Sequence, residues 1–239
     1  MHSLGNGYKA LVIGAHGTIG AAFVDQLEAD PTCAQVVTIS RATHPQFALE
    51  SETGIEQTAR AVAEQGPFAL IIDATGALTI DGHGPEKHLG ALNAERLARA
   101  FEVNTIGPAL LIKHFSPLLA KDHSIFAKLS ARVGSISDNH KGGWYGYRAA
   151  KAALNMVLQT AAIEMSRKRP DGIVAAMQPG TVQSPLSAPF SGGHDTVTPE
   201  EPAAGLLAAL DSLHNPPGSP PGSPSGAHFI DYKGQSIPW

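Results

Sequence analysis

A tyrosine and a lysine four residues apart, Tyr147 and Lys151, are the residues of this sequence best suited to acid–base chemistry. They stand at the start of a predicted helix over 147–167, where a spacing of four places both side chains on one face. A free tyrosine has a pKa of about 10 and is a poor acid–base catalyst at neutral pH. A neighbouring ammonium group favours the phenolate and lowers that pKa, so the pair predicts a general acid–base.

Three glycines follow the first apolar run of the chain. The run Ala10–Ile13 is short and continuous, which is typical of a parallel strand buried on both faces, and a helix is predicted over 19–29. Glycines between a strand and a helix let backbone N–H groups approach a pyrophosphate at the helix N-terminus, although a purely structural turn has the same composition. The residues expected to hold a dinucleotide here are Gly14, His16, Gly17, Thr18, Ile19 and Gly20, with solvent exposure as the alternative for the histidine.

The end of the second predicted strand, Val36–Ile39, indicates which dinucleotide is preferred. A carboxylate there would accept hydrogen bonds from the ribose hydroxyls and repel a 2′-phosphate. The sequence has Ser40 and Arg41 instead, a hydroxyl donor and a guanidinium that both suit a phosphate. We therefore predict NADP(H) as the preferred cofactor and NAD(H) as the lesser one, unless Arg41 is only a solvated surface charge.

Alternating strands and helices must position these residues. The predicted strands are Ala10–Ile13, Val36–Ile39, Phe68–Ile72, Ser124–Leu129, Ile173–Met177 and Ala227–Tyr232. Besides the helices over 19–29 and 147–167, we predict Gly54–Gln65 and a long helix, Leu89–Asn104 and Pro108–Ala120, bent at Gly107-Pro108. The alternation predicts βαβ units and one α/β domain over 1–239, a Rossmann-type doubly wound parallel sheet with helices in three α/β/α layers. In that architecture ligands bind outside the carboxyl ends of the strands.

Composition excludes several classes of protein. Apolar residues are 43% and charged residues 16%, enough for a sizeable core. With 17 Lys and Arg against 21 Asp and Glu, the net charge of −4 argues against a nucleic-acid or anionic-membrane partner. The first residues lack a signal peptide's apolar segment, so we expect a cytoplasmic protein. Cys33 is the single cysteine, more typical of a small buried hydrophobe than of a reactive thiol, and no metal site is predicted.

Two segments depart from the alternation. Residues 215–226 contain a tandem Pro-Pro-Gly-Ser and are predicted to form an exposed loop, either a surface insertion or a Pro-rich docking motif. Residues 186–198 are rich in Gly, Ser and Pro and are predicted to form a lid over the substrate pocket. Pro189-Phe190 are expected to supply one apolar wall, and Trp144 with Tyr145 another, with packing in the core as the alternative for Tyr145.

Taken in chain order, these motifs resemble the short-chain dehydrogenase/reductase family across nearly the whole sequence. The resemblance is carried by the glycine turn, Ala74-Thr75-Gly76 in place of the family's Asn-Ala-Gly, Val103-Asn104, Tyr147 with Lys151, and Pro179-Gly180. Residues 129–136 and 142–148 are similar to the C-factor/sniffer-type subgroup of carbonyl-reductase-like enzymes.

The resemblance implies roles for these residues. Tyr147 would exchange a proton with the substrate oxygen, Lys151 would hold the nicotinamide ribose and lower the pKa of Tyr147, and Asn104 would anchor a water that relays protons to Lys151. The further cofactor-binding residues that it implies are Ala74, Thr75, Gly76, Pro179, Gly180, Val182 and Ser184.

Two positions depart from the family. In the glycine turn the middle glycine is displaced, giving Gly17-Thr18 where many members have a residue followed by glycine, although three glycines still flank the helix start. The usual Ser-Ser after the fifth strand of the family, whose second serine is catalytic, is Ser130-Ala131 here. A substitute hydroxyl would come from Ser130, or from Ser135, which precedes Tyr147 by twelve residues, or no serine assists. Ser130 is expected to point away from the face of Ala131 by strand alternation, whereas Ser135 lies in a glycine-bearing loop.

These observations favour an NADP(H)-dependent oxidoreductase that transfers hydride between nicotinamide and a small to medium apolar carbonyl or alcohol of unknown identity. A dinucleotide-binding regulatory or signalling module with little turnover is the alternative, because Ala131 replaces a catalytic hydroxyl. A non-redox dehydration or epimerisation would need another acid–base residue, such as His140 or Asp138. Small and apolar residues along 89–120 and 147–167 predict that these helices pair in a homodimer or homotetramer.

Overall fold

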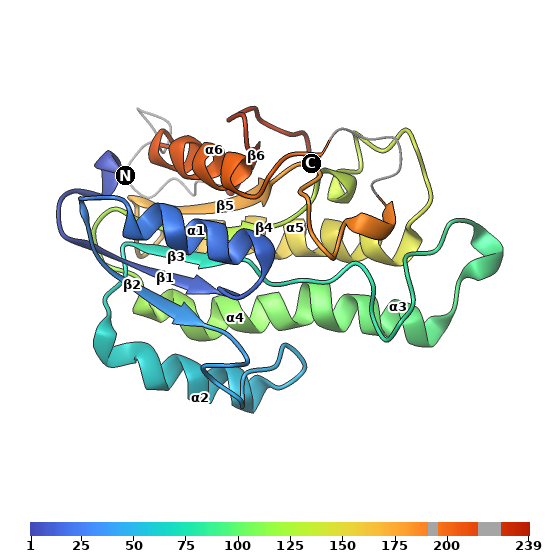
Figure 1. The fold of residues 1–239 in the computed structure, drawn as a ribbon, viewed down its shortest axis with the longest axis horizontal. Coiled ribbons are helices and arrows are strands. Elements are labelled where there is room, and N and C mark those ends of the chain that lie inside the picture. The colour runs from blue at the N-terminus through green and yellow to red at the C-terminus, as the bar shows by residue number, and fades with distance from the viewer. Residues whose placement is uncertain (191–195, 215–225) are drawn as a thin grey trace.

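The sheet is the element on which the rest of the chain is arranged. The computed structural model describes residues 1–190, 196–214 and 226–239, and within them six parallel strands pair in the order β2-β1-β3-β4-β5-β6 (Figure 1). The strands are β1 (Tyr8–Ile13), β2 (Cys33–Ile39), β3 (Leu70–Asp73), β4 (Ser124–Leu129), β5 (Gly172–Gln178) and β6 (His228–Asp231). The predicted doubly wound parallel sheet is confirmed. Its strand order reverses between β1 and β3, the point at which such sheets bind ligands.

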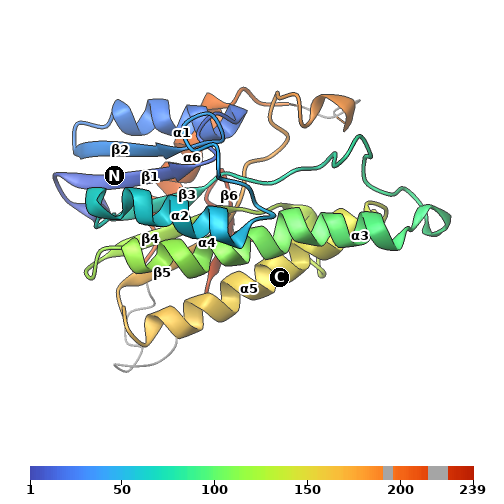
Figure 2. The same cartoon turned by 90° about the horizontal axis from the view of Figure 1, so that it is seen from below.

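Helices cover both faces of this sheet. Figures 1 and 2 show α1 (Thr18–Glu28) and α6 (Glu200–Asp211) on one face and α2 (Glu52–Val62), α4 (Gly107–Phe115) and α5 (Tyr145–Ser166) on the other. Helix α6 was not predicted from the sequence, although its buried Ala203, Leu206 and Leu210 recur at helical spacing. Pro202 is compatible with this helix, because it lies in the first turn, where a proline is tolerated.

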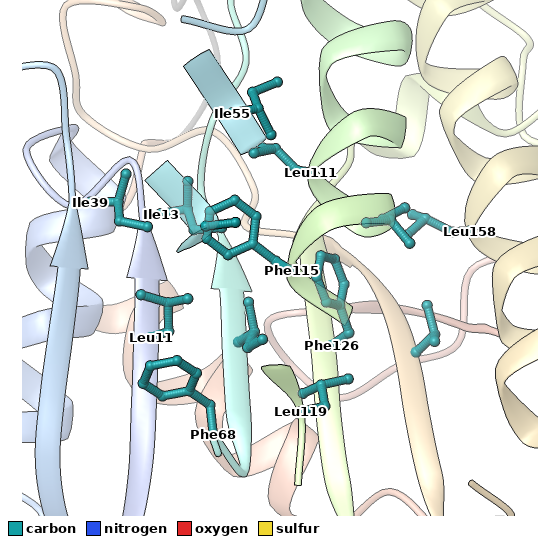
Figure 3. Close-up of a cluster of buried hydrophobic side chains, with 14 of the residues drawn as sticks. Leu11, Ile13, Ile39, Ile55, Phe68, Leu111, Phe115, Leu119, Phe126 and Leu158 are labelled. Atoms are coloured by element: carbon teal, nitrogen blue, oxygen red, sulfur yellow. The ribbon is translucent and has the colours of Figure 1, made fainter. Parts of the chain in front are cut away.

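The core is divided between the two faces by the alternation of side chains along each strand. Leu11 and Ile13 of β1 join the cluster against α2, α4 and α5, whereas Ala10 and Val12 join the cluster against α1 and α6. Figure 3 shows the first cluster, in which aromatic rings from α4 and β4 fill the space between helix and sheet. Because both faces are buried, the strands cannot shift their register, and their carboxyl ends form a rigid edge.

The long helix predicted over 89–120 is interrupted differently from the expectation. It begins as α3 (Ala94–Phe101), capped by Asn93, widens into a π-helical segment over Glu102–Ile106, and continues as α4. Gly107 and Pro108, where the bend was predicted, are the first two residues of α4 and directly follow the π-helical segment. Gly107 is needed for packing instead, because a Cβ there would lie 2.7 Å from the Leu49 side chain.

Part of the two irregular segments lies outside the described residues, namely 191–195 of the predicted lid and 215–225 of the Pro/Gly-rich loop. On the described sides of the lid, Ala188–Phe190 form a short 3-10 turn and Val182 pairs with Val197 in a parallel bridge. Among the described helices, none combines the length and apolar character needed to cross a membrane.

Candidate active site

The N-terminus of α5 carries the acid–base pair expected from the sequence. Tyr147 and Lys151 lie on one face of the helix, and the Lys151 Nζ is 5.7 Å from the centroid of the Tyr147 ring. Lys151 is buried and its Nζ donates a hydrogen bond to the backbone oxygen of Leu129, at the end of β4, 3.1 Å away. The pair therefore lies at the edge formed by the carboxyl ends of the strands.

Burial dominates the electrostatics of both groups. It raises the pKa of Tyr147 above its ordinary value, because the phenolate would lose its hydration. It lowers the pKa of Lys151 well below its ordinary value, and the nearby positive charge of Lys128 lowers it further while Asp73 opposes the change. In the structure, the effect of burial on the pKa of Tyr147 therefore outweighs the lowering expected from the lysine.

Asn104 lies beside this pair and is fully buried in the π-helical segment. Its side-chain amide accepts from the Ala77 backbone N–H at 3.1 Å and donates to the Ala77 backbone oxygen at 2.9 Å. A Cβ on Gly76 would lie 3.2 Å from the Asn104 Oδ1 and 3.5 Å from the Lys151 Nζ, and Gly76 has a φ of 133°. The turn after β3, Asn104 and Lys151 therefore converge, and only glycine fits between them.

A cavity of about 270 Å³ opens next to Tyr147 and Asn104. Its other walls come from the segment between β3 and α3 and from the first turns of α3, including the charged or titratable side chains of His83, Glu86 and Arg96. Neither His140 nor Asp138 lines this cavity in the described part of the chain, and His140 is exposed.

Glu86, which sequence reasoning missed, holds the N-terminus of α5. Its carboxylate is only 8% exposed and accepts from the Gly146 backbone N–H at 2.9 Å, while its backbone oxygen accepts from Trp144 N–H at 2.5 Å. A Cβ on Gly146 would lie 3.1 Å from both carboxylate oxygens. A carboxylate at a helix N-terminus is favoured by the helix dipole. The contact joins residues sixty positions apart, so no local pattern could have indicated it.

Arg148 and Gly134 fix the segments on either side of Tyr147. The Arg148 guanidinium donates to the backbone oxygens of Gly143 at 3.0 Å and Val133 at 3.3 Å. A Cβ on Gly134 would lie 2.8 Å from the Lys151 Cβ, so glycine lets the turn after β4 press directly against α5.

The two serine candidates are buried and make local hydrogen bonds. The Ser130 Oγ donates to the Asn155 Oδ1 at 2.6 Å, so its hydroxyl is directed at α5, four residues after Lys151. The Ser135 Oγ accepts from the Asp138 backbone N–H at 3.0 Å.

The glycine turn after β1 presents a helix N-terminus without side-chain acceptors. Gly14 has a φ of 83°, and α1 begins after Gly17 with neither a capping side chain nor an acidic residue in its first turn. By contrast, α2 and α3 are capped by Ser51 and Asn93 and carry a glutamate in the first turn. The free N–H groups and the dipole of α1 suit a pyrophosphate. His16 is exposed at this turn.

At the end of β2, the Ser40 hydroxyl and Thr43 form a local turn in which the Ser40 Oγ accepts from Thr43 N–H at 3.2 Å. Arg41 follows on the surface and is exposed. The sequence did not single out Thr43, yet this turn orients the backbone at the expected 2′-phosphate position.

The turn after β5 leads toward the predicted lid segment. Gly180 has a φ of 77°, and a Cβ there would lie 3.0 Å from the Tyr232 ring. Ser184 is bound locally, its Oγ accepting from the Ser187 backbone N–H at 3.2 Å. Phe190 stacks edge-to-face on Trp144 with ring centroids 5.5 Å apart, so the two expected apolar walls form one cluster.

Comparisons with known proteins agree with this fold and indicate the family of the chain. A family model described as Enoyl-(Acyl carrier protein) reductase matches residues 21–204. The 1-hydroxy-2-glutathionyl-2-methyl-3-butene dehydrogenase of Rhodococcus sp. (strain AD45) is 33% identical over 171 residues, 71% of either chain. The C-signal protein of Myxococcus xanthus is 33% identical over 176 residues, 73% of this chain and 94% of that protein.

Solved structures share the whole fold. Carbonyl reductase Sniffer of D. melanogaster superposes with a TM-score of 0.78 at 18% identity, covering 98% of this chain and 100% of its own. The chain belongs to the short-chain dehydrogenase/reductase family, as the sequence motifs predicted. Membership of that family makes it an NAD(P)-dependent oxidoreductase.

Replacing Glu86 is expected to loosen the N-terminus of α5. Glu86→Ala removes a buried acceptor and should lower the free energy of unfolding by about 1–2 kcal/mol, whereas Glu86→Gln keeps an acceptor oxygen and should lose less. Urea denaturation followed by circular dichroism measures both. Glu95→Gln is the control, an exposed glutamate in the first turn of α3 where Asn93 already caps the helix. Equal losses for Glu86→Ala and the control would contradict the capping role.

Proposed function

We propose that the protein is an NADP(H)-dependent reductase of carbonyl compounds, or dehydrogenase of the corresponding alcohols, with Tyr147 as general acid–base. The observation that carries the proposal is that Tyr147 and Asn104 line one cavity. Lys151 lies behind them, 5.7 Å from the centroid of the Tyr147 ring and next to Gly76. A solved carbonyl reductase from chicken fatty liver with NADPH bound shares the fold, with a TM-score of 0.77 at 22% identity over 98% of this chain and 95% of that one.

The nicotinamide, when bound, supplies or accepts the hydride at the substrate carbon. Tyr147 gives its proton to the substrate oxygen during reduction and takes it back during oxidation. Because burial raises the pKa of Tyr147, its phenol keeps the proton at neutral pH, which suits reduction. Oxidation needs the phenolate, so its rate rises with pH. Lys151 lies against the ring and stabilises that phenolate when it is itself protonated.

The cofactor site that we propose runs along the carboxyl edge of the sheet. The uncapped N-terminus of α1 would hold the pyrophosphate, and Ser40 with Arg41 would bind the adenosine 2′-phosphate. The residues proposed to line it elsewhere are His16, Thr18, Ile19, Gly20, Ala74, Thr75, Gly76, Pro179, Gly180, Val182 and Ser184.

The cavity favours a polar substrate over the apolar one expected from the sequence. Glu86 and Arg96 present opposite charges to it, and His83 adds a further hydrogen-bonding group. A substrate lacking polar groups would displace water from these side chains without replacing its hydrogen bonds. The Rhodococcus relative, named for a hydroxylated glutathionyl compound, agrees with a polar substrate for this site.

Tyr147→Phe is expected to abolish most of the reductase activity while retaining NADPH binding. Loss of a positioned general acid lowers kcat by about 10²–10⁴-fold. NADPH oxidation is measured with a panel of polar and apolar aldehydes, ketones and quinones, and NADPH binding by fluorescence titration. Tyr145→Phe is the matched control, because it removes the hydroxyl of a tyrosine two residues earlier in the same helix, which does not line the cavity. Tight NADPH binding by the wild type with no turnover of any substrate would reject the reductase and favour the regulatory module.

Arg41→Ala is expected to weaken NADPH binding much more than NADH binding, because it deletes a charged partner of the 2′-phosphate. A charge-assisted hydrogen bond contributes about 1.5–3 kcal/mol, so the NADPH dissociation constant should rise by roughly tenfold or more. Arg60→Ala, an exposed arginine of α2 paired with Glu56, is the control. Equal losses for both cofactors would show that Arg41 does not read the phosphate.

Ser135→Ala is expected to lower kcat/KM at least as much as Ser130→Ala, because the Ser130 hydroxyl already donates to Asn155. Loss of one hydrogen bond to a developing oxyanion costs about 2.7–4 kcal/mol, a rate loss of roughly a hundredfold. Neither change should alter NADPH affinity. If both variants and the double variant keep wild-type rates, no serine assists; a gain of activity in Ala131→Ser would then identify the missing hydroxyl.

A further inference from the structure

Two buried residues of opposite charge lie behind the proposed site. Lys128 of β4 and Asp73 of β3 are register partners on neighbouring strands (Figure 1), and both side chains are 0% exposed. The Lys128 Nζ lies 3.0 Å from the Asp73 Oδ1. Desolvating two charges is costly, and a buried pair of this kind is a poor source of stability compared with apolar residues of similar volume.

Both members of the pair form hydrogen bonds with the turn that follows β3. The Asp73 Oδ1 accepts from the Thr75 backbone N–H at 2.9 Å and from its Oγ1 at 2.6 Å, and the Lys128 Nζ donates to the Thr75 backbone oxygen at 2.5 Å. The Asp73 Oδ2 is buried without a hydrogen-bond partner among the described residues. An ion pair that leaves one carboxylate oxygen unsatisfied is not explained by hydrogen bonding alone.

Lys151 of α5 contacts residues that follow the pair along each of the two strands. Its Nζ donates to the backbone oxygen of Leu129, the residue after Lys128, and lies 3.5 Å from the Cβ position of Gly76, the residue after Thr75. The titratable groups that act on the amine are Lys128 from β4, Asp73 from β3 and Tyr147 from its own helix. Lys128 lowers the pKa of Lys151 and Asp73 raises it.

We propose that Asp73 and Lys128 are a positioning pair, which holds the Ala74–Gly76 turn against Lys151 and sets the pH at which the Lys151 amine changes its charge. The two members shift the titration of Lys151 in opposite directions. Removing the positive member should make Lys151 easier to protonate, and removing the negative member should make it harder. A pair with only a structural role would leave the titration of Lys151 unchanged.

The titration of Lys151 is measured directly, without turnover. Protein labelled with ¹³C at lysine Cε is followed by NMR across pH, and Lys151→Met assigns the Lys151 signal. We expect the midpoint of Lys151 to rise by about one pH unit in Lys128→Met and to fall in Asp73→Asn. Lys113→Met is the matched control, because it removes a lysine paired with Glu52 on the surface at 2.5 Å; it should leave the Lys151 midpoint in place.

Folding of each variant is checked by circular dichroism, and the double variant Asp73→Asn/Lys128→Met keeps the test falsifiable if Lys128→Met does not fold. It carries neither charge, so its Lys151 midpoint is expected above that of Asp73→Asn. Midpoints that stay at the wild-type value, or that move in the same direction in both single variants, would overturn the proposal.

The kinetic consequence rests on the proposed function, and the two can fail separately. If the enzyme reduces carbonyl compounds, the pH profiles of kcat for Asp73→Asn and Lys128→Met should be displaced from the wild-type profile, with little change in the KM for NADPH. Opposite NMR shifts without any reductase activity in the wild type would support the pair and reject the reductase. Reductase activity in the wild type, with a Lys151 midpoint that stays in place in the variants, would support the reductase and reject the role of the pair.

Discussion

The parallel pairing of strands that are buried on both faces is the constraint on which the site depends. It brings the ends of β1, β3, β4 and β5 to one edge, although those ends are separated by long stretches of sequence. Each turn at that edge then needs an unusual backbone or a close approach, which explains the glycines at positions 14, 76 and 180. The proposed dinucleotide site and the proposed catalytic groups both follow from this one arrangement of strands.

The rigid edge by itself would not orient Tyr147. Helix α5 is held at its first turn by a carboxylate from a distant loop, by an arginine that binds three backbone oxygens around it, and by a glycine contact with the turn after β4. The Glu86 hydrogen bond is buried, and a buried hydrogen bond is costly to leave unmade. The Arg148 bonds are more exposed to water. Together these contacts convert a helix that could rotate or slide into one whose tyrosine faces the cavity.

Burial and charge then tune the chemistry in opposite directions. The phenol of Tyr147 keeps its proton more firmly and the amine of Lys151 holds its proton less firmly than in water, since each loses hydration of its charged form. Charged neighbours adjust this balance, and the Asp73–Lys128 pair is close enough to do so. The charged side chains that line the cavity, such as Arg96, are proposed to act on the substrate instead.

The sequence by itself determined the alternation of strands and helices, the glycine turn, the spacing of Tyr147 and Lys151, and the family, because these depend on local periodicity and on residue types within a few positions. It did not indicate helix α6, whose early proline resembles a helix breaker, nor the place of the π-helical segment at Asn104. The roles of Glu86, Asp73 and Lys128 were decided only by the tertiary structure. Lys128 was a visible signal, a lysine within an apolar strand, but its partner lies fifty-five residues earlier. Burial, charge pairing and helix capping between distant segments depend on how strands are ordered in the sheet, and that order is set by packing of the whole chain.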